Sequence, residues 1–243
     1  MKDNDARHLP GPEYWCGEFH AGYDHSDLEA SRDDWDKRSV NFVHKGRKED
    51  YVEYFLKRLP LCEGDSVFDM ACGAGAVTIP LAKAGHPVIA VDFSQGMLDA
   101  LSEYAAEEGV DALIQTHRRA WQDDLTDLPV ADVAISSRSL ILDDLADAIA
   151  KLESKARRLC VITLPGPDRK HMGEPRTSRY RIQTTAIVMN YLMSLGRLPK
   201  LDYIEYAHIP HAGDPNDTRR RSTWCYIEWT PAMRDDQGTS ASI

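Results

Sequence analysis

The sequence lacks the features that mark secreted and membrane proteins. Its five cysteines are an odd number, widely spaced and without a C-x-x-C pair, which predicts reduced thiols rather than a disulfide framework. No apolar run approaches 18 residues, so nothing predicts a membrane span. The polar start, Met1-Lys2-Asp3-Asn4-Asp5, contains no apolar stretch typical of a signal peptide. Together these absences predict a cytoplasmic protein with no membrane partner.

The sequence also lacks a basic excess. Its net charge is -10 and its pI about 5.3, which argues against a general affinity for nucleic acid because backbone binding needs a basic surface. Hydrophobic residues make up 42% and charged residues 28% of 243 positions, and no internal repeat is visible. This balance predicts one globular domain of ordinary size.

A glycine-rich stretch organises the rest of the chain. Residues 67–75 (VFDMACGAG) predict a buried strand followed by a tight turn, because the strand is apolar except for Asp69. Gly73 and Gly75 permit positive φ and let the backbone approach a ligand. Residues 76–84 have helical periodicity. The pattern is a strand, a glycine turn and a helix.

A second predicted strand follows at 87–91 and ends on Asp92. This acid lies 19 residues after Gly73. An acid at about this distance, at the end of the next strand, is well placed to bind ribose hydroxyls. The unit therefore predicts an adenosine-containing ligand.

The glycine turn departs from the phosphate-binding motifs. Thr78 stands where G-x-G-x-x-G has its third glycine, and no G-x-x-x-x-G-K-[ST] occurs. Asp69, beside the turn, would repel phosphates but suits a ligand that carries an ammonium and a sulfonium, such as S-adenosylmethionine. In its D-x-x-C-G-x-G form the stretch resembles the first motif of class I S-adenosylmethionine-dependent methyltransferases of the small-molecule type, and Asp92 resembles the acid of their second motif. The resemblance extends from about Trp35 to Thr163.

The resemblance implies a cofactor site made from several loops. A polar or acidic residue between strands three and four would take the adenine amino group, and Asp124, with Asp123 next, fits this best by its distance to Leu128-Pro129. Trp121 would pack against the ring; alternatively, the acids are solvated and Trp121 belongs to the core. Ser136 lies where the family contacts the methionyl part. The candidate cofactor-binding residues are Asp69, Cys72, Gly73, Gly75, Asp92, Phe93, Trp121, Asp123, Asp124 and Ser136.

A polar cluster, Ser136-Ser137-Arg138-Ser139, follows the predicted fourth strand at 131–136. Open parallel sheets bind ligands beyond the carboxyl ends of their strands. Arg138 could clamp a carboxylate of the cofactor or of the substrate, or form a structural salt bridge to Asp143 or Asp144. The cluster occupies the place of the N-P-P-Y type motif, which disfavours nucleic-base or protein-glutamine methylation.

Residues 1–32 are predicted to form an N-terminal arm or lid. The aromatic residues in this segment predict that it is ordered. It covers a sheet edge or a partner chain, or closes the active site. A helix opening at Asp33 follows, and the resemblance implies that this element, with Trp35, closes over the methionine end of the cofactor.

Residues 33–230 are predicted as one α/β methyltransferase domain and 231–243 as a polar tail. We expect a doubly wound, mostly parallel seven-stranded sheet of the Rossmann-like methyltransferase type, closed by an antiparallel hairpin. The other predicted helices are 48–59, 94–108 and 143–156, and the other strands are 111–118, 159–164, 202–209 and 222–230.

The segment 168–197 is interpreted as substrate-facing or dimer-forming. Its first part is rich in Arg, Lys and His, which fits either an anionic substrate or a solvated face. The helix from Thr177 to Leu195 is apolar on nearly all sides in its later part and predicts burial in the core or against a second subunit, so a homodimer is one alternative. The candidate substrate residues are Trp35, Arg138, His171 and Tyr180.

The predicted activity is transfer of the S-adenosylmethionine methyl group to a small acceptor, with an anionic acceptor as a hypothesis. If a general base assists, the candidates are His20, His25, His171 and Tyr180, and none stands out. No metal is assigned, because His208 and His211 would face opposite sides of a strand. The alternatives are an NAD(P)-dependent oxidoreductase and a non-catalytic S-adenosylmethionine-binding protein.

Overall fold

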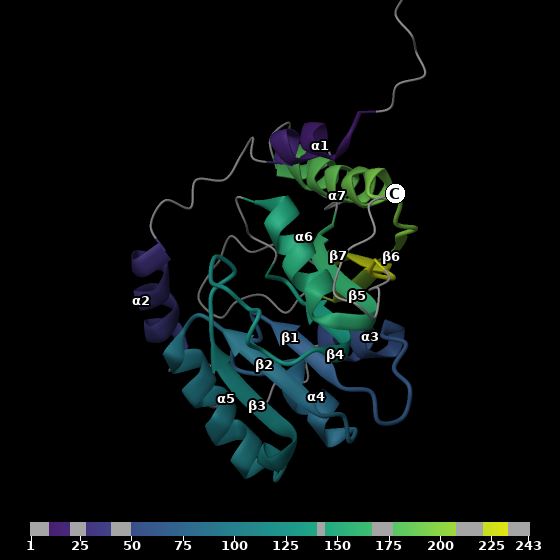
Figure 1. The fold of residues 1–243 in the computed structure, drawn as a ribbon. Helices are drawn as coiled ribbons and strands as arrows, with labels where there is room; N and C mark the ends of the chain where they lie inside the picture. Colours follow the sequence, from purple (N-terminus) through teal and green to yellow (C-terminus); the bar gives the residue numbers. More distant parts are fainter. Residues whose placement is uncertain are drawn as a thin grey trace, which may run out of the picture.

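The computed structural model describes residues 10–19, 28–39, 50–139, 144–166, 177–207 and 221–232. These residues form a single sheet flanked by helices (Figure 1). The fold confirms the predicted α/β class with its mostly parallel sheet and antiparallel hairpin.

The sheet has seven strands in the order β3-β2-β1-β4-β5-β7-β6. All neighbouring pairs from β3 to β5 are parallel, and β7 runs antiparallel to both β5 and β6. The strands are β1 (Val67–Met70), β2 (Val88–Asp92), β3 (Ile114–Arg118), β4 (Ala131–Ser136), β5 (Ala156–Pro165), β6 (Lys200–Ala207) and β7 (Arg221–Trp229).

Helices cover both faces of the sheet because the central strands bury both of their faces. All four residues of β1 and all five of β2 are buried. On one face, Val67 and Val88 pack with α3 (Asp50–Arg58), α4 (Thr78–Lys83) and α5 (Gln95–Glu107). On the other face, Phe68 and Ile89 share a core with α6 (Leu145–Ser154) and α7 (Thr177–Ser194). This two-layered covering is what a continuous apolar strand requires.

Two N-terminal helices lie at different places on this body. Helix α1 (Pro12–Phe19) contacts α7 and α6, and Phe19 is buried in the core that they share. Helix α2 (Leu28–Ser39) lies at the left of the view, against α5, whereas α1 lies at the top (Figure 1). Order in the aromatic segment is therefore confirmed for α1, while the roles of arm and lid stay predictions.

Several predicted boundaries were wrong by a few residues. Helix α2 begins at Leu28 rather than at Asp33, so the predicted limit of the arm at residue 32 falls inside a helix. A 3-10 turn, Asp111–Leu113, precedes β3 and takes the first part of the predicted third strand. Helix α6 ends at Ser154, and Ala156 already begins β5, because Ala156 pairs with Ala131 of β4.

Helix α7 is less uniformly buried than its composition suggests. Val188 and Leu192 are completely buried, whereas the Met193 side chain is 58% exposed. Of the tail, only residues 231 and 232 are described, and the connection between β6 and β7 lies outside the described residues. No helix within the described ranges combines the length and apolar character needed to cross a bilayer.

Candidate functional site

The strand order reverses between β1 and β4, and open α/β sheets have a crevice at the carboxyl ends of the strands at such a point. From β1 the chain proceeds through β2 to β3 on one side, and through β4 to β5 on the other. Open α/β sheets bind ligands at such a switch point. The glycine turn follows β1, and the polar cluster from Ser136 follows β4, so both predicted loops meet this crevice.

The two glycines of the turn have different surroundings. Both have positive φ, 56° at Gly73 and 85° at Gly75. A Cβ on Gly75 would lie 2.3 Å from Leu101 Cδ1, so this glycine is needed for packing against α5. A Cβ on Gly73 would meet no atom within 4 Å, so open space lies beside this backbone. Gly73 is therefore the position at which a ligand could approach the chain.

Backbone strain accompanies the crevice. Ala71, directly after β1, has φ of 59°, and Arg138, after β4, has φ of 61°. Residues with a Cβ adopt this conformation at a cost of about 1–2 kcal/mol. These are the two non-glycine residues with positive φ in the described part of the chain, and both follow the central strands.

Replacing Ala71 by glycine is expected to raise the free energy of unfolding by about 0.5–1 kcal/mol, because relief of the strain exceeds the added freedom of the unfolded chain. Urea unfolding measures the effect. Ala74→Gly is the matched control: Ala74 lies in the same turn at ordinary φ, so its replacement should destabilise. Equal destabilisation by both substitutions would contradict the strain argument.

Asp92 is held by the turn and by α5. Its Oδ2 accepts a hydrogen bond from the Gly73 N–H at 2.8 Å, and its Oδ1 accepts one from the Ser94 N–H at 2.9 Å. Burial raises the pKa of this carboxyl above its usual value. Two oxygens with further lone pairs are thereby fixed beside the open space at Gly73, where they can accept hydrogen bonds from ligand hydroxyls.

Asp69 lies beneath the turn. Its side chain is buried and accepts a hydrogen bond from the Thr78 hydroxyl at 2.6 Å. Burial raises the pKa of Asp69 to about 7, with a smaller contribution from the neighbouring Asp92. Asp69 therefore supports the turn through Thr78, and its role toward a ligand stays a prediction.

Helix α2 brings a third acid to this place. The Asp36 Oδ1 accepts hydrogen bonds from the Ser94 hydroxyl and from the Gly96 N–H, the latter at 3.1 Å. These contacts place a carboxylate at the N-terminus of α5, where the helix dipole favours it. The Ser94 hydrogen bond lowers the pKa of Asp36. Ser94 is also the predicted N-cap, accepting from the Met97 N–H at 3.1 Å.

Docking of α2 depends on a close approach of its backbone. A Cβ on Gly96 would lie 2.6 Å from the Ser39 hydroxyl and 3.3 Å from the Asp36 backbone. Trp35 is partly buried on the same helix, with the Arg38 guanidinium 5.1 Å from its ring centroid. The structure thus places Trp35 on a helix that packs against α5, and its role toward substrate stays a prediction.

The residues predicted for adenine make local contacts. Asp123 accepts from the Ala120 N–H at 2.8 Å, and Asp124 accepts from the Thr126 N–H and hydroxyl, both at 2.8 Å. Trp121 is buried in the core that includes α6, and its indole N–H has no partner among the residues that the structure describes. These contacts agree with the structural alternative, but the unpartnered donor and the spare carboxylate lone pairs leave the adenine role as a prediction.

Three other predicted cofactor residues differ in access. Phe93 is half-buried directly after Asp92. Cys72 is buried, and burial raises the pKa of its thiol well above the usual value, so it stays protonated. Ser136 is completely buried and shares a hydrogen bond of 2.7 Å with the Ser139 hydroxyl, which also lies 3.4 Å from the Met70 carbonyl. Ser139 is only partly buried, so it is the more accessible of these two hydroxyls.

Arg138 belongs to a buried hydroxyl network. Its N–H donates to the Thr163 hydroxyl at 2.9 Å. The Tyr51 hydroxyl, from α3, lies 2.8 Å from both the Thr163 and the Ser137 hydroxyls. The Arg138 guanidinium lies 4.3 Å from the Tyr51 ring centroid. Tyr51 and Thr163 were not predicted as site residues. Tyr51 is 86 residues from Ser137 and 112 residues from Thr163 in the sequence, so no local pattern joins them.

The remaining predicted residues cannot be placed. His20, His25 and His171, and the side chain of Tyr180, lie outside the described residues, as do His208 and His211. The candidate bases and the absence of a metal therefore stay predictions.

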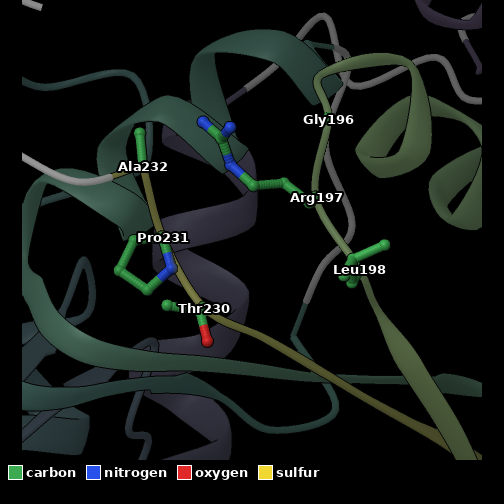
Figure 2. A pocket seen from close by; sticks show the side chains of 6 residues that line it. All are labelled: Gly196, Arg197, Leu198, Thr230, Pro231 and Ala232. Carbon is green, nitrogen blue, oxygen red and sulfur yellow. The ribbon is translucent and has the colours of Figure 1, made fainter.

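A surface hollow of about 310 Å³ lies away from the crevice (Figure 2). It lies between the end of α7 and the end of β7, lined by Gly196, Arg197, Leu198, Thr230, Pro231 and Ala232. Because Trp229 pairs with Cys160 and Trp224 with Pro165, the end of β7 lies toward the beginning of β5. The hollow thus lies at the amino ends of the parallel strands, whereas the glycine turn lies at their carboxyl ends.

Comparison with known proteins agrees with this geometry. Residues 67–159 match the methyltransferase domain family. An uncharacterized protein of Haemophilus influenzae is 37% identical over 131 residues, covering 53% of this chain and 48% of that protein. A demethylmenaquinone methyltransferase of Lactobacillus johnsonii is 34% identical over 95 residues, 38% of this chain and 37% of that one. The chain thus spans about half or less of the length of these relatives.

Solved structures share the fold. Magnesium protoporphyrin IX methyltransferase from Synechocystis, solved with bound S-adenosylhomocysteine, has a TM-score of 0.52 at 17% identity over 90% of this chain and 94% of its own. At this identity the likeness concerns the fold. The family match of residues 67–159, the strand order and the site geometry agree with a class I S-adenosylmethionine-dependent methyltransferase domain. The resemblance based on Asp69, Gly73, Gly75 and Asp92 is confirmed.

Proposed function

We propose that this protein transfers the methyl group of S-adenosylmethionine to a small-molecule acceptor. The observation that carries the proposal is the group of three carboxylates, Asp36, Asp69 and Asp92, gathered around the glycine turn. Burial raises the pKa of both Asp69 and Asp92, with a smaller contribution from Asp92 on the first and from Asp36 on the second, so a positively charged ligand would be favoured there. A pyrophosphate would be repelled.

The residues would divide the cofactor between them. Asp92 accepts hydrogen bonds from the ribose hydroxyls, and Gly73 leaves room for the adenosyl group. Trp121, Asp123 and Asp124 form the adenine side, with Phe93 next to the ribose. Ser136 and Ser139 lie at the methionyl side, next to the end of β1. Cys72 would contribute through its backbone rather than through its thiol, because the thiol stays protonated.

S-adenosylmethionine supplies an electrophilic methyl group on a sulfonium. A lone pair of the acceptor forms the new bond to carbon, the carbon–sulfur pair stays on sulfur, and any proton on the acceptor atom passes to solvent or a base. The protein's contribution is to align the acceptor and to exclude water. Relatives named for quinone precursors and a structural neighbour named for a porphyrin support a small, flat acceptor.

Calorimetric titration with S-adenosylmethionine, S-adenosylhomocysteine and NAD tests the cofactor. We expect micromolar binding of the first two and none of NAD. Binding of NAD alone would overturn the proposal in favour of an oxidoreductase. Release of S-adenosylhomocysteine in the presence of an acceptor separates an enzyme from a non-catalytic binding protein.

Substitution of Asp92 by asparagine is expected to weaken S-adenosylhomocysteine binding by on the order of 1–3 kcal/mol, about 5- to 150-fold, because a charged acceptor of the ribose hydroxyls is lost. Asp99→Asn is the control, since Asp99 is an exposed acid on α5 whose carboxylate contacts Gln95. Unchanged affinity in a folded Asp92→Asn protein would remove Asp92 from the site.

A further inference from the structure

We propose that Asp36, on helix α2, is a positioning residue for the cofactor, because it fixes the start of α5, which in turn holds Asp92. Docking of α2 and binding of the cofactor would then strengthen each other. The inference rests on the proposed function, in which Asp92 accepts hydrogen bonds from the ribose hydroxyls. Two observations carry it: the hydrogen bonds that connect α2 to Asp92, and the close approach of α2 to Gly96.

A chain of hydrogen bonds joins α2 to the glycine turn. The Asp36 Oδ1 accepts from the Ser94 hydroxyl. The Ser94 N–H donates to the Asp92 Oδ1 at 2.9 Å, and the Asp92 Oδ2 accepts from the Gly73 N–H at 2.8 Å. Ser94 is completely buried and Asp92 is only 5% exposed, so neither has much freedom to move alone. A displacement of α2 would therefore reach the carboxylate beside Gly73.

Ser94 depends on α2 for one of its two side-chain hydrogen bonds. Its hydroxyl accepts from the Met97 N–H at 3.1 Å, and it donates to Asp36. Asp36 also accepts from the Gly96 N–H at 3.1 Å. The first amides of a helix have no partner within the helix, so each needs one from outside. Helix α5 is thus capped by Ser94 of its own chain segment and by Asp36 of α2 (Figure 1).

Capping from a second helix makes the coupling reciprocal. If Asp92 is better placed for the ribose when α2 is docked, the cofactor binds the docked state more tightly and shifts the population toward it. Linkage then requires that bound cofactor favour docking by the same factor by which docking favours the cofactor. Asp36 would act on the ligand through Ser94 and Asp92, without touching it.

Gly96 offers a way to displace α2 without altering a carboxylate. A Cβ there would lie 2.6 Å from the Ser39 hydroxyl and 3.3 Å from both the Cα and the carbonyl oxygen of Asp36. Ser39 is buried, and its hydroxyl donates to the same carbonyl at 2.7 Å. The α2 backbone itself must therefore move outward. Alanine favours a helix more than glycine does, so the substitution should not weaken α5.

The test is calorimetric titration of the folded variants with S-adenosylhomocysteine. Asp36→Ala and Gly96→Ala should each weaken binding by about fivefold or more. Asp34→Ala is the matched control on α2, because Asp34 is an exposed acid 3.9 Å from Lys37. Gln95→Ala is the matched control on α5, because Gln95 is the exposed neighbour of Gly96. Both controls should bind like the wild-type protein.

The conservative variant separates positioning from direct charge attraction. In Asp36→Asn the amide oxygen can still accept both hydrogen bonds, and asparagine caps a helix about as well as aspartate. We expect affinities for S-adenosylmethionine and S-adenosylhomocysteine within about twofold of wild type. A selective loss of S-adenosylmethionine, the ligand with the sulfonium charge, would mean that the Asp36 charge acts on the ligand directly and would overturn the positioning role.

Hydrogen exchange of residues 28–39 tests the reciprocal effect. S-adenosylhomocysteine should slow exchange of the α2 amides in the wild-type protein, and should do so less in Asp36→Ala and Gly96→Ala. A helix that merely supported the fold would show no such response to ligand. Identical exchange of α2 with and without bound ligand would overturn the coupling.

The remaining outcomes are also decisive. Wild-type affinity in both Asp36→Ala and Gly96→Ala would overturn the inference, and so would an equal loss in the Gln95→Ala control. Should Asp36→Ala fail to fold, Gly96→Ala and exchange in the wild-type protein decide the matter. Failure of the wild-type protein to bind S-adenosylhomocysteine at all would overturn the proposed function first, and the role of Asp36 with it.

Discussion

Gly75→Ala is expected to lower the free energy of unfolding by about 2–4 kcal/mol. Two costs add: a φ of 85° that disfavours any residue with a Cβ, and a Cβ placed 2.3 Å from Leu101 Cδ1 and 3.2 Å from Ile79 Cγ1. Leu101 is completely buried, so its side chain has little room to withdraw. Urea unfolding followed by circular dichroism measures the loss.

The matched substitution is Gly73→Ala, two residues earlier in the same turn. Its φ of 56° resembles that of Ala71, which the chain already accommodates, and its Cβ would enter open space. We expect a loss of stability of only about 1 kcal/mol, together with a loss of S-adenosylhomocysteine binding of tenfold or more, because we propose that the cofactor approaches the chain through that space. Similar stabilities of the two variants would contradict the distinction between a packing glycine and a ligand glycine.

This contrast shows what the sequence could and could not predict. Both glycines belong to a recognisable motif, and the alternation of Val67 and Phe68 between two covered faces made the strand predictable. The side chain that faces each glycine was not predictable, because Leu101 is brought to Gly75 only by the packing of α5 on the sheet. Local sequence patterns predict helices and strands, whereas the contacts between them become known only from the assembled fold.

The same limit applies to Arg138 and the residues around it. Arg138 was noticed because it follows a buried strand, but its alternatives stayed open because its neighbours were unknown. Tyr51 appears in the sequence as an ordinary residue of an amphipathic helix, and Thr163 as a polar residue in an apolar strand. Only the fold brings their hydroxyls to within 2.8 Å of each other beneath Arg138. Similarly, Asp36 was one acid among several before its contacts with Ser94 and Gly96 became visible.

Asp69 should make stability and cofactor binding respond to pH in opposite directions. Its pKa is raised to about 7 in the folded protein, from a reference value of 3.8. For a raised carboxyl, the folded state binds more protons, so any stability it contributes is present in acid and is lost as the pH rises through 7. The ionised form, however, is the one that attracts a cationic ligand. Wild-type affinity for S-adenosylmethionine should therefore increase between pH 6 and pH 8, with release of a proton that calorimetry in two buffers can detect.

Asp69→Asn is expected to stabilise the protein at pH 8 by about 2–4 kcal/mol, given about 1.4 kcal/mol for each unit by which the pKa is shifted. The asparagine oxygen can still accept the Thr78 hydrogen bond, so the substitution mainly removes the buried charge. At pH 4 the gain should nearly vanish, because the wild-type carboxyl is then protonated in the folded state. The same variant should bind S-adenosylmethionine more weakly at pH 8 and show little dependence of affinity on pH.

Urea unfolding at the two pH values, with the exposed Asp99→Asn as control, decides the point. A variant destabilised equally at pH 4 and pH 8 would mean that Asp69 acts through hydrogen-bond geometry alone. A pH-dependent gain accompanied by weaker cofactor binding would instead mean that the fold retains a costly buried carboxyl beneath the glycine turn because its charge serves the ligand. The three acids around the turn would then be understood as one electrostatic site, in which binding of a cation offsets a repulsion built into the protein without it.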